Sequence, residues 1–188
     1  MKIISLLLAC LFAVSAFAQQ SSTSQPSASP AVTDVEKEFP QAKTEDLSNI
    51  DTIIKALYGV ISGPAGPRDW DRFKTLFIPE AHLIFSGKNK EGKLIHRAMS
   101  PSEYQEQAGG FFLKEGFFEN AVVNKVDQFG TVAQVFSTYE SRHEKDGKPF
   151  ARGINSIQLL NDGTRWWVVS ILWDSERPDN PIPKKYLK

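Results

Sequence analysis

Apolar positions recur every three or four residues in three segments of the chain, and this spacing predicts three amphipathic helices. The first helix is expected over residues 46–61, because the Ser-Gly-Pro-Ala-Gly-Pro run at 62–67 cannot continue it. The second helix is expected over residues 68–77. The third is expected over residues 101–112, since Ser100 and the Pro and Glu that follow form a pattern that starts helices.

The other patterned segments are short runs bounded by turn residues, which is typical of strands. Two short strands are expected at residues 81–86 and 93–99. Four longer strands are expected at residues 117–126, 131–143, 150–160 and 165–174. Asp146-Gly147 and Asp162-Gly163 predict tight hairpins between the last three strands. The element order, two helices, two strands, one helix and four strands, predicts an α+β fold with a mostly antiparallel sheet.

The N-terminal region has the layout of an exported protein. One lysine, an apolar run and Ala-Phe-Ala predict a cleavable signal peptide over residues 1–18, so the protein is expected in the periplasm or outside the cell. A lipoprotein is the alternative, because the residues before Cys10 resemble a lipidation box, although the apolar run continues past Cys10. A Ser/Gln/Pro-rich linker is expected over residues 19–45, the domain over 46–175 and an extended tail over 176–188.

Charge and cysteine content narrow the classes of partner. Acidic and basic residues balance at 22 each, so no nucleic acid and, after signal cleavage, no membrane is expected as a partner. Cys10, the only cysteine, lies in the predicted signal peptide. His82 and His96 could face each other across a hairpin, but no carboxylate accompanies them at ligand spacing, so neither a metal nor a cofactor is expected. A small molecule is the expected partner.

Two segments resemble a known superfamily. Residues 70–81, WDRFKTLFIPEA, and residues 162–169, DGTRWWVV, resemble structural junctions of the nuclear transport factor 2-like, or SnoaL-like, proteins. The resemblance implies a cone-shaped α+β barrel in which three helices pack on a curved sheet. That superfamily includes isomerases, dehydratases, cyclases and binding modules, so the fold does not select a function. The catalytic aspartate of its ketosteroid isomerase branch falls here at Phe85, which cannot abstract a proton, while a helix tyrosine of that branch could correspond to Tyr58.

Strand register predicts which side chains line the cone. If both Asp-Gly pairs form two-residue turns, one face carries five rows. The rows are Arg142 with Ala151 and Asp174, Glu140 with Gly153 and Leu172, Thr138 with Asn155 and Ser170, Phe136 with Ile157 and Val168, and Gln134 with Leu159 and Trp166. This face is apolar at one end and charged at the other, as expected of a pocket with a wet mouth. A slip of one residue in a turn would exchange the two faces.

The predicted pocket supplies the candidate functional residues. Glu140 and Asp174 are the candidate catalytic carboxylates, because burial beside apolar walls would raise their pKa. The candidate ligand-binding residues are Tyr58, Phe85, Tyr104, Phe136, Arg142, Asn155 and Trp166. A purely structural ion pair between Arg142 and Asp174 is the competing interpretation.

Three functions remain open from the sequence. The first is a binding domain for a small, partly apolar molecule, and the second is a metal-free lyase or isomerase that uses a pocket carboxylate as acid or base. The third is a protein-interaction module that uses the opposite face of the sheet, which carries Trp167 and Trp173 and could also form a homodimer. Whether the protein is an enzyme is left open.

Overall fold

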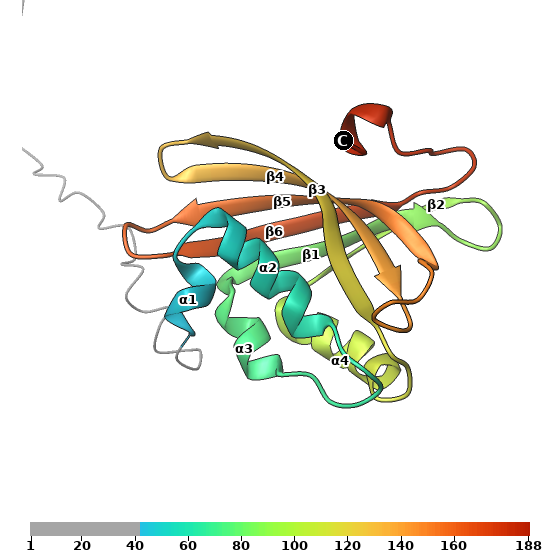
Figure 1. Ribbon diagram of the computed structural model, residues 1–188, viewed down its shortest axis with the longest axis horizontal. Helices are drawn as coiled ribbons and strands as arrows, with labels where there is room; N and C mark the ends of the chain where they lie inside the picture. The colour runs from blue at the N-terminus through green and yellow to red at the C-terminus, as the bar shows by residue number, and fades with distance from the viewer. Residues whose placement is uncertain (1–41) are drawn as a thin grey trace, which may run out of the picture. The chain divides into compact units, whose positions relative to one another are not determined.

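Six strands form one sheet in the computed structural model, in the order β2-β1-β6-β5-β4-β3 (Figure 1). The strands are β1 (Phe77–Lys88), β2 (Leu94–Met99), β3 (Phe118–Phe129), β4 (Val132–Arg142), β5 (Ala151–Asn161) and β6 (Trp166–Ser175). All neighbours are antiparallel except β1 and β6, which run parallel. The structure describes residues 42–188, so the predicted signal peptide and the predicted linker as far as residue 41 lie outside the described residues.

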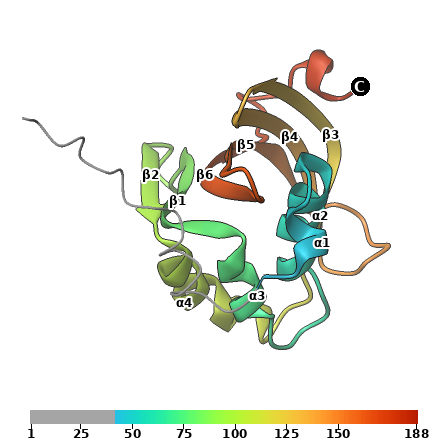
Figure 2. The same cartoon turned by 90° about the vertical axis from the view of Figure 1, so that its left-hand side faces the viewer.

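The helices pack inside the curve of the sheet (Figure 2). They are α1 (Thr44–Leu47), α2 (Ile50–Ile61), α3 (Trp70–Thr75) and α4 (Pro101–Phe112), and a 3-10 helix, η2 (Lys184–Tyr186), follows near the C-terminus. The predicted α+β class is confirmed by this architecture. Within residues 42–188, no helix has the length and apolar character needed to cross a bilayer.

The helix predicted over residues 46–61 is divided in the structure. Asn49 has extended backbone angles, φ −154° and ψ 172°, which a helix cannot contain. Its side chain accepts a hydrogen bond from the Thr52 amide at 2.9 Å, and the Thr52 hydroxyl accepts one from the Asn49 amide at 3.2 Å. This reciprocal capping starts α2 at Ile50 and separates it from α1. The predicted start of α4 is observed, with Ser100 capping the helix.

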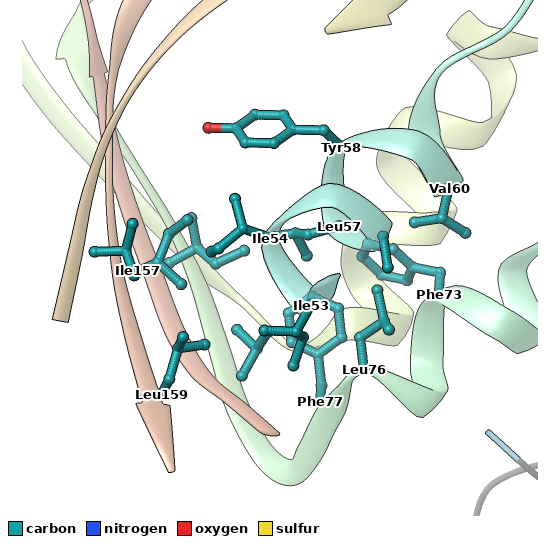
Figure 3. Close-up of a cluster of buried hydrophobic side chains, with 14 of the residues drawn as sticks. Ile53, Ile54, Leu57, Tyr58, Val60, Phe73, Leu76, Phe77, Ile157 and Leu159 are labelled. Atoms are coloured by element: carbon teal, nitrogen blue, oxygen red, sulfur yellow. The ribbon is translucent and has the colours of Figure 1, made fainter. Parts of the chain in front are cut away.

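One apolar core joins α2 and α3 to the sheet. Ile53 and Ile54 of α2 lie on the side that faces Ile157 and Leu159 of β5, and Phe73 of α3 belongs to the same cluster (Figure 3). Each of these side chains is at most 5% exposed. Burial of an aliphatic or aromatic side chain of this size contributes about 1.5–3 kcal/mol to folding. This core fixes α2 against the strands.

The register of the last three strands differs from the predicted one. Asp146-Gly147 is part of a longer loop rather than a two-residue turn, so Gly153 pairs with Tyr139 instead of Glu140. This shift of one residue exchanges the two faces of β4.

The turn between β5 and β6 also differs from a two-residue hairpin. Asn161 pairs with Trp166, so four residues form the turn, and the Asp162 carboxylate accepts backbone hydrogen bonds from Thr164 and Arg165 at 2.8 and 2.9 Å. A register shift then follows Val168 in β6. Trp166 and Val168 therefore stay on the predicted inner face. In the part of β6 that follows the shift, the side chains predicted on the inner face point outward and the others point inward.

The C-terminal segment lies on the outer face of the sheet. The Glu176 amide donates to the Arg152 carbonyl at 2.7 Å, and the Thr138 hydroxyl donates to the Tyr186 carbonyl at 2.6 Å. The Tyr186 ring lies 4.9 Å from the Phe136 ring, measured between centroids. This segment therefore covers part of the face that the sequence predicts to be the inside of the cone.

Candidate functional site

A cavity of about 240 Å³ lies between α2, α4 and the inner face of β3 to β6. Its wall is largely aromatic and includes Tyr58, Tyr104, Phe117, Tyr139, Phe150 and Trp173. The polar lining comes from Glu119, Ser141 and Asn155. A concave, mostly apolar wall with a few converging polar groups is the usual form of a small-molecule site.

Glu119 is the one carboxylate among the described residues that line this cavity. It lies in β3 opposite Ser141 of β4, whose hydroxyl donates to its Oε2 at 2.7 Å. Its backbone is held from the C-terminal end of α2, because the Ser62 hydroxyl donates to the Tyr58 carbonyl at 2.8 Å and accepts from the Glu119 amide at 2.9 Å. The position of the carboxylate is therefore fixed from both a strand and a helix.

Burial raises the pKa of Glu119 to about 7, although hydrogen bonds from Ser141 and Asn155 act in the opposite direction. At neutral pH the cavity therefore holds comparable amounts of the acid and the carboxylate. Such a group can donate a proton, accept one or pair with a cation.

A hydrogen-bond chain lies beside Glu119. The Ser137 hydroxyl donates its single proton to Oδ1 of Asn124 at 2.6 Å, so the Tyr58 hydroxyl is the donor in its 2.6 Å bond with Ser137. The Asn155 amide in turn donates to the Tyr58 oxygen at 3.0 Å. Tyr58 therefore has its proton engaged, and burial raises the pKa of its hydroxyl. These contacts make Tyr58 a positioning residue for Asn155.

The structure places some of the sequence-predicted residues at this cavity. Tyr58, Tyr104 and Asn155 line it. Phe85 lies next to it, with its ring centroid 6.0 Å from that of Trp173, and borders an adjoining pocket. Trp166 is buried in the core and is not part of the lining.

The predicted inner positions of Glu140 and Asp174 are wrong. Glu140 forms an ion pair with Arg142 and lies 3.9 Å from Arg152, and Asp174 forms an ion pair with Arg177. The predicted pairing of Arg142 with Asp174 is therefore not observed.

The register accounts for both errors, because the shifts in β4 and β6 turn these side chains to the outer face. Phe136 is turned outward with them and contacts Tyr186. The same shifts turn Tyr139 and Trp173 inward, although the sequence predicts them on the opposite face.

Glu119 was not a sequence-based candidate. The available signal was a single acidic residue between Phe117-Phe118 and the apolar run Ala-Val-Val at 121–123. Counting back from the turn between β3 and β4 would not have placed it, because β3 has a register shift between Ala121 and Val123. The signal is recognisable only once the partner strand is known.

Neither a family model nor a curated protein matches the chain. Several solved structures are similar to it. The chain is similar to a protein from Novosphingobium aromaticivorans described as the β subunit of an aromatic-ring-hydroxylating dioxygenase, at 13% identity over 69% of this chain and 90% of that one, with a TM-score of 0.52.

Two further solved structures are similar to the chain. An uncharacterised protein with a cystatin-like fold from Caulobacter vibrioides has 15% identity over 70% of this chain and 90% of that one, with a TM-score of 0.50. An NTF-2-like protein of unknown function from Silicibacter pomeroyi has 14% identity over 67% and 92%, with a TM-score of 0.44. Likeness at this identity concerns the fold alone.

Proposed function

We propose that this chain, which has the nuclear transport factor 2-like cone fold that its sequence predicts, binds a small, partly apolar molecule in the cavity around Glu119. The observation that carries the proposal is the placement of one buried carboxylate in an otherwise mostly apolar cavity of about 240 Å³. That volume equals about eight water molecules at roughly 30 Å³ each, which suits a ligand with one or two rings. Glu119, Asn155 and Ser141 would supply its polar contacts.

The neutral probe 4-phenylbutan-1-ol tests this proposal. Chemical-shift changes in a heteronuclear NMR titration should centre on the cavity and saturate. Ala151 lines the cavity, so Ala151→Phe should fill it and abolish the changes. Gln134→Phe adds a similar ring at an exposed outer position of β4 and is the matched control that should keep binding. Equal binding by Ala151→Phe and the wild type would contradict the proposal.

A second candidate function is proton transfer on a bound carbonyl compound, as in a metal-free isomerase or lyase. The specific observation in its favour is the pKa of Glu119, which burial raises to about 7, the range expected of a general base at neutral pH. In this reaction the Glu119 carboxylate accepts a proton from the carbon next to the carbonyl and then returns it to the substrate.

Deuterium exchange tests this second function. Phenylacetone in deuterium oxide should exchange its acidic hydrogens faster with the wild-type protein than with Glu119→Gln, as measured by proton NMR. Glu140→Gln, which removes a carboxylate on the outer face, is the control. Equal exchange rates for the wild type and Glu119→Gln would exclude Glu119 as the base.

We also propose that the protein acts after export, in the periplasm or outside the cell. The support is the signal-peptide pattern of residues 1–18. N-terminal sequencing of protein purified from its producing cells should give a chain that starts at Gln19. A retained Met1 or an acylated Cys10 would contradict cleavage after residue 18.

A further inference from the structure

Among the described residues, the cavity wall carries negative charge and no positive charge. Of the residues that line it between positions 42 and 188, only Glu119 carries a full charge, and none is a lysine, arginine or histidine. The tyrosines are neutral, because burial raises the pKa of Tyr58, Tyr104 and Tyr139 above the ordinary value. An ionised Glu119 is therefore the dominant charge in the cavity.

No lysine, arginine or histidine in the described part of the chain forms an ion pair with this carboxylate. Glu119 also borders a depression between α2 and β3, where Asp51, Lys55 and Lys145 lie, but neither lysine forms an ion pair with it. Hydrogen bonds from Ser141 and Asn155 leave further lone pairs of the carboxylate for a ligand.

The aromatic wall, like the Glu119 carboxylate, favours a positively charged ligand. Tyr104, Phe117, Tyr139, Phe150 and Trp173 line the cavity together with Glu119. Ring faces carry partial negative charge and attract cations, and aromatic rings around a carboxylate are a recurrent arrangement for binding organic ammonium groups. An anion would meet repulsion from both the carboxylate and the rings.

A second pocket adjoins the cavity. It has a volume of about 370 Å³ and shares Tyr104, Phe117 and Trp173 with the first. Its remaining wall is apolar apart from Gln107 and includes Phe85 and Met99 from β1 and β2. A ligand whose polar end lies at Glu119 can therefore place an apolar arm in the second pocket.

We propose that the ligand is an organic cation, an amine that is protonated at neutral pH and is joined to an apolar or aromatic arm. This inference rests on the proposed function, since it names the class of molecule that the cavity around Glu119 binds. The ammonium group pairs with the Glu119 carboxylate and lies against the aromatic rings. The arm extends past Trp173 into the second pocket.

Three probes of the same shape test the inference: 4-phenylbutylamine, 4-phenylbutan-1-ol and 4-phenylbutyrate. Their dissociation constants are measured by NMR titration of the full chain at pH 7.5. The amine should bind on the order of tenfold more tightly than the alcohol, because a charged pair in a partly buried site is stronger than a neutral hydrogen bond. The acid should bind most weakly.

Variants assign the preference to Glu119. Glu119→Gln should reduce the ratio between amine and alcohol to within about twofold, whereas Glu140→Gln, which changes an outer carboxylate, should retain the wild-type ratio. If Glu119→Gln does not fold, the order of the three probes on the wild-type protein still decides the question. Trp173→Leu supplies a second test, because loss of the ring should weaken the amine more than the alcohol.

The outcomes separate the two proposals. Tighter binding of the alcohol than of the amine would overturn the organic-cation inference and leave the binding function intact. Binding of none of the three probes, with no shifts at the cavity, would overturn the binding function itself. An amine preference that persists in Glu119→Gln would overturn the assignment to this carboxylate.

Discussion

Glu119→Gln should change how the stability of the protein depends on pH. Burial raises the pKa of Glu119 from its ordinary 4.5 to about 7 in the folded state. Between these values the folded protein holds a proton that the unfolded chain has released, so the free energy of unfolding falls as pH rises. A gap of about 2.5 pH units, at about 1.4 kcal/mol per unit, gives a loss of about 3 kcal/mol across the window. Above pH 7 this contribution is constant.

Urea unfolding at a series of pH values between 4 and 8.5 measures the effect. The free energy of unfolding of Glu119→Gln, relative to the wild type, should increase by about 3 kcal/mol between pH 4.5 and pH 8. Glu115→Gln makes the same substitution at an exposed position after α4 and controls for the loss of one negative charge. A difference between Glu119→Gln and the wild type that stays constant over this range would refute a buried, proton-binding Glu119.

Three other substitutions test the fold around the site. Burial alone would raise the pKa of Asp162, but hydrogen bonds from Trp167 and the following turn lower it to about 2. Asp162→Asn should therefore remove about 2 kcal/mol of stability at pH 7, as measured by urea unfolding. Near pH 1.5 the variant and the wild type should have the same stability, because the wild-type carboxylate is then protonated. Gly153→Ala should cost about 1–3 kcal/mol, because a Cβ would collide with the Tyr139 hydroxyl and a β6 carbonyl; an unchanged melting temperature would contradict that close approach. Phe77→Ala should cost about 3–5 kcal/mol by the same unfolding assay, since the ring is fully buried.

The element types could be predicted from the sequence because each rests on local patterns. The apolar stripe of α2 and the capping residues of α4 act within a few positions of one another. The division between α1 and α2 was missed because the capping residue is Asn49 and its partner is a threonine, rather than the more familiar serine and glutamate.

The residues that line the cavity were much less predictable than the element types, because the lining depends on strand pairing. A one-residue difference in the loop before Ala151 turns Glu140 outward and Tyr139 inward. The register shift in β6 likewise turns Trp173 inward. Loop length and bulges are set by contacts between strands, and no local pattern encodes them. Tyr58 and Asn155 were found because neither α2 nor β5 changed its inner face.

The place of β6 in the sheet has a consequence for how the protein is made. This strand is the last of the six described strands, yet it lies between β1 and β5, and its pairing with β1 brings Phe77 beside Val168. Contacts between such distant positions are slow to form, and a chain growing from the ribosome cannot pair β1 with β6 until residues 166–175 have been made. The hairpin of β3 and β4 can pair early, but the two halves of the sheet can join only through their final strand. The complete sheet therefore forms only after β6 has been made.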